Sequence, residues 1–468
     1  MRRRTLITAI AVLSALAITA PATGSDSGRT PATRRSVRAV ATPAAVRTAG
    51  GGIKVYPVPT SSAGLERITT APNGDMWFVE QDKNKVGRIT PKGVFTEYTL
   101  PAQTSDGSRV MDLDVAADGR VWVVWDEGWQ AISFTPAAPN SASNYSLGSS
   151  PYGESVRLGA NGKTPWITMS FDEDGIAFLK NGHFFWPANA PECDGALARG
   201  RDGHMWCADF DKVVRVARDG KSGVTAALPD DATYPNSIAA GPNGAVWVGR
   251  DNQGTWFTYP GDGNIGWINS DTTSHFIKLG SKVAPRSLIR SGTDVWFTSI
   301  GGAKGIGHIN QAGIGAITKV GNYHPTSLTI GKDGAIWFTD SDHNVIVRVP
   351  RSALQQTDLN LGDGSQLRPA SATRRATLNK VKKGKKRVFK GTVTSTWSAC
   401  RAGAIQVRRV KGHSSVVIAR GRARSNGSYA IAIKKKRVKK GTYFTRVVQN
   451  TTRGTVCKVA NSPRRTVR

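Results

Sequence analysis

A histidine and an aspartate late in the chain are the side chains best placed to act together as a base and a carboxylate. His324 precedes the apolar run 326–330, and Asp340 ends the next run, 335–340. Histidine is the side chain whose charge changes most easily near neutral pH, so it can remove a proton from a substrate. We take His324 and Asp340 as the candidate catalytic pair. The alternative is that His324 is a polar surface residue without a catalytic role.

The two runs that carry this pair belong to a phrase that the sequence repeats. "GKDGAIWFTD" (331–340) has near-copies at 73–78, 118–123, 202–207 and 243–248, and weaker copies at 161–167 and 292–297. Asn-Gly and Asp-Gly supply the positive φ of tight hairpin turns, and tryptophan with β-branched neighbours favours a strand. The tryptophan recurs at intervals of 40 to 49 residues, as Trp77, Trp122, Trp166, Trp206, Trp247, Trp296 and Trp337.

This interval is typical of propeller blades that contain four strands each. Ile336 and Phe338 point to one face of their strand and Trp337 to the other, so both faces are apolar, as stacked blades require. Segment 51–60 precedes the first repeat and has the pattern of an outer strand that completes the last blade. The sequence therefore predicts an all-β protein in which residues 51–358 form a seven-bladed β-propeller, with the tryptophans packed between blades.

A propeller places the loops before its first strands and after its second strands on one face, around the mouth of a central channel. The polar residues after second strands are Glu80, Asp82, Asp126, Glu127, Asp172, Asp209, Arg250, Asp251, Asp340, Asp342 and His343. Those before first strands are Glu66, Arg109, Glu154, Asp194, Tyr234, Asn236, Arg286 and His324.

From these we select a ligand-binding channel mouth made of Glu80, Asp126, Glu154, Asp209, Tyr234, Arg250 and Arg286. Carboxylates in such a set can also hold a hard divalent cation through oxygen ligands. The alternative is a rim of solvated turn residues that binds nothing.

One repeat resembles a known family. Residues 68–101, ITTAPNGDMWFVEQDKNKVGRITPKGVFTEYTLP, are similar to a repeat of the virginiamycin B lyases, also called streptogramin B lyases. The resemblance extends over about 51–360 and is most specific in the first and last repeats. It implies a seven-bladed propeller and a magnesium-dependent elimination that opens the ring of a cyclic depsipeptide antibiotic.

The resemblance also implies where lyase chemistry would lie. In the family a histidine enters one blade, Glu-x-His enters the next, and a glutamate follows that blade's tryptophan strand. With the tryptophans aligned, the residues here are Asn236, Val283, Ala284, Pro285 and Ser299. We therefore expect a propeller that binds a small-molecule, peptide or glycan ligand and lacks the lyase residues. The alternative is an active lyase that uses His324, Asp340 and Mg²⁺ on a streptogramin B-type or related substrate.

The four cysteines, Cys193, Cys207, Cys400 and Cys457, allow three pairings. We expect Cys193 to pair with Cys207 and Cys400 with Cys457, because each pair falls within one predicted module. The first pair would fix a loop at the channel mouth. Cys-x-x-Cys and His-x-x-His spacings do not occur, so the sequence does not favour a structural zinc site.

The N-terminal segment has the pattern of an export signal. Arg2, Arg3 and Arg4 precede a short apolar run that ends near Ala20-Pro21-Ala22. The sequence thus predicts a signal peptide over 1–22 and a flexible leader over 23–50, in a secreted protein that is extracellular or associated with the cell wall. The alternative is an uncleaved N-terminal anchor.

Positive charge is concentrated at the C-terminal end. Residues 371–468 contain 28 lysines and arginines and no acidic residue, whereas residues 51–370 contain 28 basic and 32 acidic residues. Alternating strand patterns predict a linker over 359–375 and a basic β-sandwich over 376–468 that resembles Ig-like or carboxypeptidase-regulatory-like modules.

Such a surface attracts anions. We expect an anionic cell-wall polymer as its partner, and a monomeric chain. Aromatic residues are few and no groove-reading helix is predicted, so specific nucleic-acid binding is not expected. The alternative is a surface that is merely solubilising.

Overall fold

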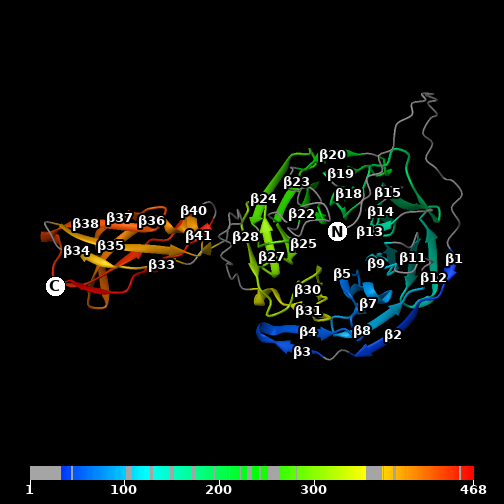
Figure 1. The fold of residues 1–468 in the computed structure, drawn as a ribbon, viewed down its shortest axis with the longest axis horizontal. Helices are drawn as coiled ribbons and strands as arrows, with labels where there is room; N and C mark the ends of the chain where they lie inside the picture. Colours follow the sequence, from blue (N-terminus) through cyan, green and yellow to red (C-terminus); the bar gives the residue numbers. More distant parts are fainter. Residues whose placement is uncertain are drawn as a thin grey trace, which may run out of the picture.

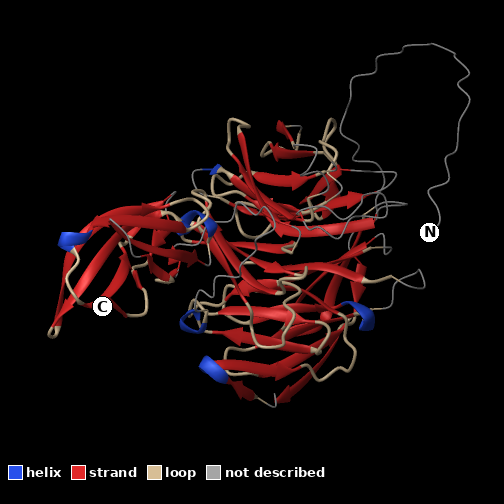
Figure 2. Cartoon of the chain, turned by 60° about the vertical axis from the view of Figure 1, so that its left-hand side comes forward, coloured by secondary structure: helices blue, strands red, loops and turns tan. Residues whose placement is uncertain are grey.

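The computed structural model describes residues 33–467, apart from 44–45, 102–107, 127–129, 148–151, 171–174, 194, 210, 222, 229–234, 242–243, 251–262, 281, 355–370, 373, 383–385, 396 and 453–454. Among these residues, strands dominate both parts of the molecule, and the helices are short 3₁₀ turns (Figure 2). These turns include η2 (Gln81–Lys83), η5 (Arg351–Ala353), η6 (Ser398–Arg401) and η7 (Lys435–Arg437). The expected all-β class is confirmed.

Seven antiparallel sheets surround one axis (Figure 1). From the first blade to the seventh, their inner four strands are β5 (Leu65–Thr70), β6 (Met76–Glu80), β7 (Lys85–Ile89), β8 (Val94–Thr99); β9 (Val110–Val115), β10 (Val121–Trp125), β11 (Gln130–Thr135), β12 (Ala138–Ser146); β13 (Tyr152–Leu158), β14 (Pro165–Ser170), β15 (Gly175–Lys180), β16 (His183–Phe185); β17 (Leu197–Arg199), β18 (Met205–Ala208), β19 (Lys212–Val216), β20 (Val224–Ala227); β21 (Ser237–Ala240), β22 (Val246–Arg250), β23 (Gly263–Ile268), β24 (Ser274–Gly280); β25 (Pro285–Ser291), β26 (Asp294–Ser299), β27 (Gly305–Asn310), β28 (Gly315–Thr318); and β29 (Leu328–Ile330), β30 (Ile336–Asp340), β31 (Val345–Val349), β4 (Ile53–Pro57).

The ring closes by strand exchange, as the sequence predicts. Strand β4, from the N-terminal side of the first blade, pairs antiparallel with β31, so that Val55 lies opposite Val347. Asn344, whose φ of 53° is left-handed, holds the chain after β4 in place: its Nδ2 donates to the carbonyl oxygen of Thr60 (2.9 Å), and its Oδ1 accepts from the amide of Ala63 (3.0 Å). The seven first strands then contact one another in cyclic order.

Part of the expected flexible leader is instead regular structure. Strand β1 (Thr33–Arg35) pairs with β12, β2 (Arg38–Pro43) pairs with β8, and β3 (Arg47–Ala49) pairs with β4. The physical reason is the outer edge of each blade, which presents unpaired N–H and C=O groups to any nearby extended segment.

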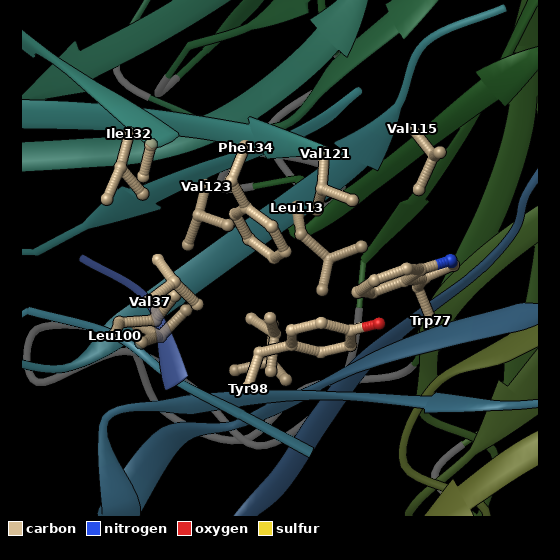
Figure 3. Packing of buried hydrophobic residues seen from close by; sticks show 14 of the residues in the cluster. Val37, Trp77, Tyr98, Leu100, Leu113, Val115, Val121, Val123, Ile132 and Phe134 are labelled. Atoms are coloured by element: carbon tan, nitrogen blue, oxygen red, sulfur yellow. The ribbon is translucent and has the colours of Figure 1, made fainter. Parts of the chain in front are cut away.

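The repeated tryptophans pack between blades, which confirms the prediction. Trp77 stacks on Tyr98 of its own blade, with ring centroids 5.1 Å apart, and meets Phe134 and Leu113 of the second blade (Figure 3). All seven are buried in second strands, and each belongs to an apolar cluster shared with the next blade around the ring. Trp337 closes the circle by packing against the first blade.

The basic C-terminal chain forms a second set of sheets beside the propeller (Figure 1). Its strands are β32 (Ser371–Ala372), β33 (Arg374–Ala376), β34 (Lys380–Lys382), β35 (Lys386–Ser395), β36 (Gly403–Lys411), β37 (Ser414–Ala423), β38 (Ser428–Lys434), β39 (Gly441–Val447), β40 (Asn450–Thr452), β41 (Thr455–Cys457), β42 (Ala460–Asn461) and β43 (Arg465–Val467). The sheets built on β35 and β36 enclose one apolar core that includes Phe389, Ile405 and Tyr443.

These sheets begin inside the segment expected to be a linker. Arg374 is buried, and its guanidinium donates to the carbonyl oxygens of Val448, Cys457 and Lys458 at 2.6 to 2.7 Å. Because this part of the chain has no acidic residue, backbone carbonyls take the place of a carboxylate partner.

Both expected cysteine pairs are present as disulfides, Cys193–Cys207 and Cys400–Cys457. All four cysteines are buried. Disulfides are typical of extracellular proteins. In the part of the chain that the structure describes, no helix has the length and apolar character needed to cross a membrane.

Candidate functional site

A polar cavity of about 420 Å³ lies at the mouth of the channel. Its lining comes from six blades and comprises Glu66, Arg67, Gln81, Met111, Glu154, Asn236, Arg286, Ser287, Ile300, Thr326 and Ser327. The first strands carry most of these residues because each begins at the mouth and runs down the channel wall. A volume of this size is typical of pockets for small ligands.

An ion pair spans the cavity between the sixth and first blades. The Arg286 guanidinium lies 3.3 Å from both carboxylate oxygens of Glu66. Both side chains are partly exposed, so the pair is available to a ligand and contributes little to stability. It presents a cation and an anion side by side.

Glu154 gives the cavity a second carboxyl group. Its Oε1 accepts from the Ser170 hydroxyl at 2.8 Å. Burial raises the pKa of Glu154, opposed by the Ser170 hydrogen bond and the charge of Arg67. The protonated form, which can donate a hydrogen bond, is therefore more accessible than for a surface glutamate.

The candidate catalytic pair lies in the seventh blade, from which Thr326 and Ser327 line the cavity. His324 Nδ1 is 2.6 Å from Asp342 Oδ2, and His343 Nδ1 is 2.8 Å from Asp340 Oδ2. Asp340 contacts His324 only through the backbone amide of His324, at 2.8 Å. The imidazole of His324 therefore pairs with Asp342 and not with Asp340.

Local chain geometry explains this exchange of partners. Asp340 ends β30 fully buried, where its carboxylate accepts the backbone amides of His324 and His343. Asp342 is exposed on the following turn and reaches the His324 ring. The two imidazole rings meet edge to face with centroids 5.5 Å apart. The His324 hydrogen bond, with smaller contributions from Lys304 and His343, lowers the pKa of Asp342.

Only some of the seven residues predicted to form the channel mouth line the cavity. Glu154 and Arg286 line the cavity. Asp126 instead accepts the backbone amide of Arg109 (2.6 Å), and Asp209 pairs with Lys212 (2.9 Å). Arg250 ends β22 but is outside the cavity lining, and Tyr234 lies outside the described residues.

Glu80 differs most from expectation. It is fully buried, on the side of β6 that faces the closing strand, and its two carboxylate oxygens have no hydrogen-bond partner among the described residues. Strand alternation explains this position: Glu80 shares the face of Met76 and Phe78, which pack into the cluster between the seventh and first blades.

Several lining residues were not selected from the sequence. Glu66 and Asn236 belonged to the wider set, whereas Arg67, Gln81, Met111 and Thr326 did not. Alternation along the first strand is a signal for Arg67, since Arg67 and Thr69 both line the channel. Gln81 and Met111 come from different blades, and the Gln81 Nε2 atom lies 3.4 Å from the Met111 sulfur. No local sequence pattern predicts this contact.

At the sixth blade, the positions that the family resemblance assigns to lyase chemistry are buried. Val283, Ala284 and Pro285 enter the sixth blade without exposure, and the buried Ser299 hydroxyl accepts the amide of Ala284 at 3.4 Å. Asn236 lines the cavity. These side chains offer no base at the sixth blade.

The mouth residues that the structure describes do not fit a magnesium ion. Among the described residues, no three His, Cys, Asp or Glu side chains are grouped so that they could hold a metal. Glu66 is paired with Arg286, and Glu154 is bonded to Ser170. Mg²⁺ requires several oxygen ligands in near-octahedral array.

Solved structures with the same fold include streptogramin B lyases. A structure described as streptogramin B lyase is 22% identical with a TM-score of 0.52, over 64% of this chain and 97% of its own. Virginiamycin B lyase from Staphylococcus aureus is 21% identical with a TM-score of 0.52, over 63% of this chain and 98% of its own. A catalytically inactive histidine-to-alanine variant of that enzyme, crystallised with quinupristin, is 22% identical at the same TM-score and coverage.

At this identity the likeness establishes the propeller fold. No protein-family model matches the chain, and no curated protein does.

Proposed function

We propose that this chain is a secreted protein whose propeller binds a small-molecule, peptide or glycan ligand at the channel mouth and does not catalyse ring opening. The observation that supports it is the pairing of a polar cavity of about 420 Å³ with apolar, buried residues at the sixth-blade entrance. The N-terminal sequence pattern and the two disulfides support export.

Chemistry at the mouth favours a ligand with both hydrogen-bonding and ionic groups. The Glu66–Arg286 pair can exchange its mutual contacts for a ligand's ammonium and carboxylate. Glu154 can accept from, or when protonated donate to, an amide or hydroxyl. An uncharged apolar ligand would leave these groups desolvated and unpaired, at a cost in affinity.

We expect quinupristin incubated with the purified chain to stay intact. The experiment follows the linear unsaturated product by mass spectrometry, with magnesium or with a chelator, because the base positions of the sixth blade are apolar. Binding is measured separately by calorimetry, and Arg286→Gln should weaken it about tenfold. Arg348→Gln, on the exposed pair with Asp333, is the matched control. Magnesium-dependent appearance of product would contradict the proposal, and no binding would exclude this depsipeptide as the ligand.

The second candidate is a lyase centred on the seventh blade. Its support is the pair of His–Asp contacts, which orient two half-exposed imidazoles on the blade whose Thr326 and Ser327 line the cavity. His324 would remove the proton beside a carbonyl, and Asp340 would position His343. If product forms, His324→Ala should reduce its rate by about 100-fold or more, the loss expected for a general base.

The C-terminal module supports a second interaction. Lys386 and Lys434 lie directly opposite each other on β35 and β38, where like charges destabilise a sheet unless an anion screens them. The adjoining turn η7, Lys435–Arg437, is exposed. The module is proposed to hold the chain on an anionic cell-wall polymer.

Attachment to isolated cell walls should fall at least tenfold between about 50 mM and 500 mM salt, because the contacts are screened charge pairs. Sedimentation with the walls measures it. Replacing Lys434, Lys435 and Lys436 by glutamine should weaken attachment more than the same change at Arg420, Arg422 and Arg424, which are also exposed. Anionic vesicles and DNA serve as comparison anions. Salt-independent attachment would rule out an electrostatic tether.

A further inference from the structure

Below the mouth, the channel is lined by arginines that outnumber their carboxylate partners. A cavity of about 280 Å³ touches all seven blades along the axis, and its charged lining residues are Arg67, Asp112, Arg157, Arg199 and Arg290. A neighbouring cavity of about 420 Å³ adds Asp114 and shares Arg157 and Arg199. Four guanidinium groups thus face two carboxylates.

The two aspartates are already engaged. Asp112 Oδ2 accepts from Arg157 (2.5 Å), from the Ser155 hydroxyl (2.7 Å) and from the Val156 amide (3.2 Å). Asp114 accepts the amides of Leu158 and Val115, at 3.0 and 2.8 Å. Burial raises the pKa of Asp114, which reduces the negative charge that it can offer. Arg157 is therefore neutralised by Asp112, whereas Arg199 and Arg290 have no carboxylate partner among the described residues.

Arg290 and Arg199 are the clearest cases. Within the described residues Arg290 has no hydrogen-bond or ion-pair partner, and its Nε is buried. Arg199 donates to the carbonyl oxygen of Gly159 at 3.0 Å and forms no ion pair in the described part of the chain. Burial and then the charge of Arg201 lower the pKa of Arg290, so a further cation, Arg201, adds positive charge near this side chain.

We infer that Arg199 and Arg290 bind an oxyanion, a phosphate or carboxylate group of a small ligand, at the end of the channel opposite the mouth. Both residues lie at or near the C-terminal ends of first strands, β17 and β25, whereas the mouth residues lie at the beginnings of such strands. Both guanidinium groups line one cavity wall without a carboxylate partner among the described residues, and an oxyanion that accepts from both would form charge-assisted hydrogen bonds.

This site is independent of the mouth. The mouth cavity shares Arg67, Ser287 and Ser327 with the channel cavity but contains neither Arg199 nor Arg290. The ligand class also differs: the mouth offers two glutamates and two arginines, whereas this end offers net positive charge. Failure of quinupristin to bind would leave the channel site standing.

The test uses the full chain with inorganic phosphate or succinate as probe, at constant ionic strength with chloride as the balancing anion. Calorimetry measures affinity, and the unfolding midpoint of the propeller gives a second readout. We expect one or both probes to bind, and Arg199→Gln and Arg290→Gln each to weaken that binding at least tenfold. The probe that binds more tightly identifies the anion's chemistry.

Two controls make the result decisive. Arg420→Gln, exposed on β37, removes one charge from the basic module and should leave the propeller affinity unchanged. Arg290→Lys keeps the charge and should bind more tightly than Arg290→Gln, which separates loss of the site from loss of folding. The inference would be overturned if the parent and both glutamine variants bound the probe equally well. It would also be overturned if chloride bound as tightly as phosphate and succinate.

Discussion

Tyr56→Ala is expected to lower the free energy of unfolding of the propeller by about 3 to 5 kcal/mol, the usual cost of removing a buried aromatic side chain. Tyr56 is 1% exposed and stacks on Trp337 with ring centroids 5.5 Å apart and planes 13° from parallel. It lies on β4, the strand that joins the N-terminal side of the chain to the seventh blade. Its loss leaves a cavity at the one place where the ring is closed by strand exchange.

Urea unfolding followed by tryptophan fluorescence measures the effect. Val40→Ala is the matched control, since Val40 is 61% exposed on β2, another added outer strand, and surface truncations change stability by about 0.5 kcal/mol or less. A loss below about 1 kcal/mol for Tyr56→Ala would show that β4 does not hold the ring closed.

The ring is predictable from sequence because its signal is local and repeated. Each copy combines a turn that needs positive φ with a tryptophan strand: Gly334 has φ 77°, and Asp333 Oδ1 accepts the amide of Ala335 at 3.0 Å. Seven such copies at blade spacing leave few alternatives to a closed disc. Strands β1 to β3 carry no such signal, and they form because open blade edges are close by.

The site is less predictable because its contacts join distant residues. Glu66 meets Arg286 across 220 positions, and Gln81 meets Met111 across blades. A difference of two positions decides that the His324 imidazole pairs with Asp342, while Asp340 accepts only the His324 backbone amide. Strand alternation predicts the face to which the Glu80 side chain points. It does not predict that Glu80 lacks a hydrogen bond, because Thr60 bonds to Glu97 instead.

Glu80 is expected to make the propeller less stable as the pH rises from about 4.5 to about 8. Burial and then the charge of Glu97 raise the pKa of Glu80 from 4.5 to about 8, against the opposing charge of Lys85. The folded chain therefore keeps a proton that the unfolded chain releases in this range, so stability is highest below the unfolded pKa and declines up to the folded one. The full difference is about 3 to 5 kcal/mol at 1.4 kcal/mol per pKa unit.

Glu80→Gln is expected to remove this decline. The variant should come close to the parent at pH 5, where the folded chain keeps Glu80 protonated and so uncharged like glutamine. Above pH 8 it should exceed the parent's stability by about 3 to 5 kcal/mol. Unfolding by urea at pH 5, 7 and 9 measures it. Glu192→Gln, at a side chain 71% exposed, is the control and should change the pH dependence little.

A decline that persists in Glu80→Gln would assign the pH dependence to the other carboxyl groups with raised pKa, Asp114 and Glu154. These two carboxyl groups differ from Glu80 in their hydrogen bonds. Asp114 accepts two backbone amides and Glu154 accepts the Ser170 hydroxyl, and such hydrogen bonds favour the charged form. Glu80 has no bond of this kind among the described residues, so burial acts on it with the least opposition. Its substitution should therefore account for the largest part of the pH effect.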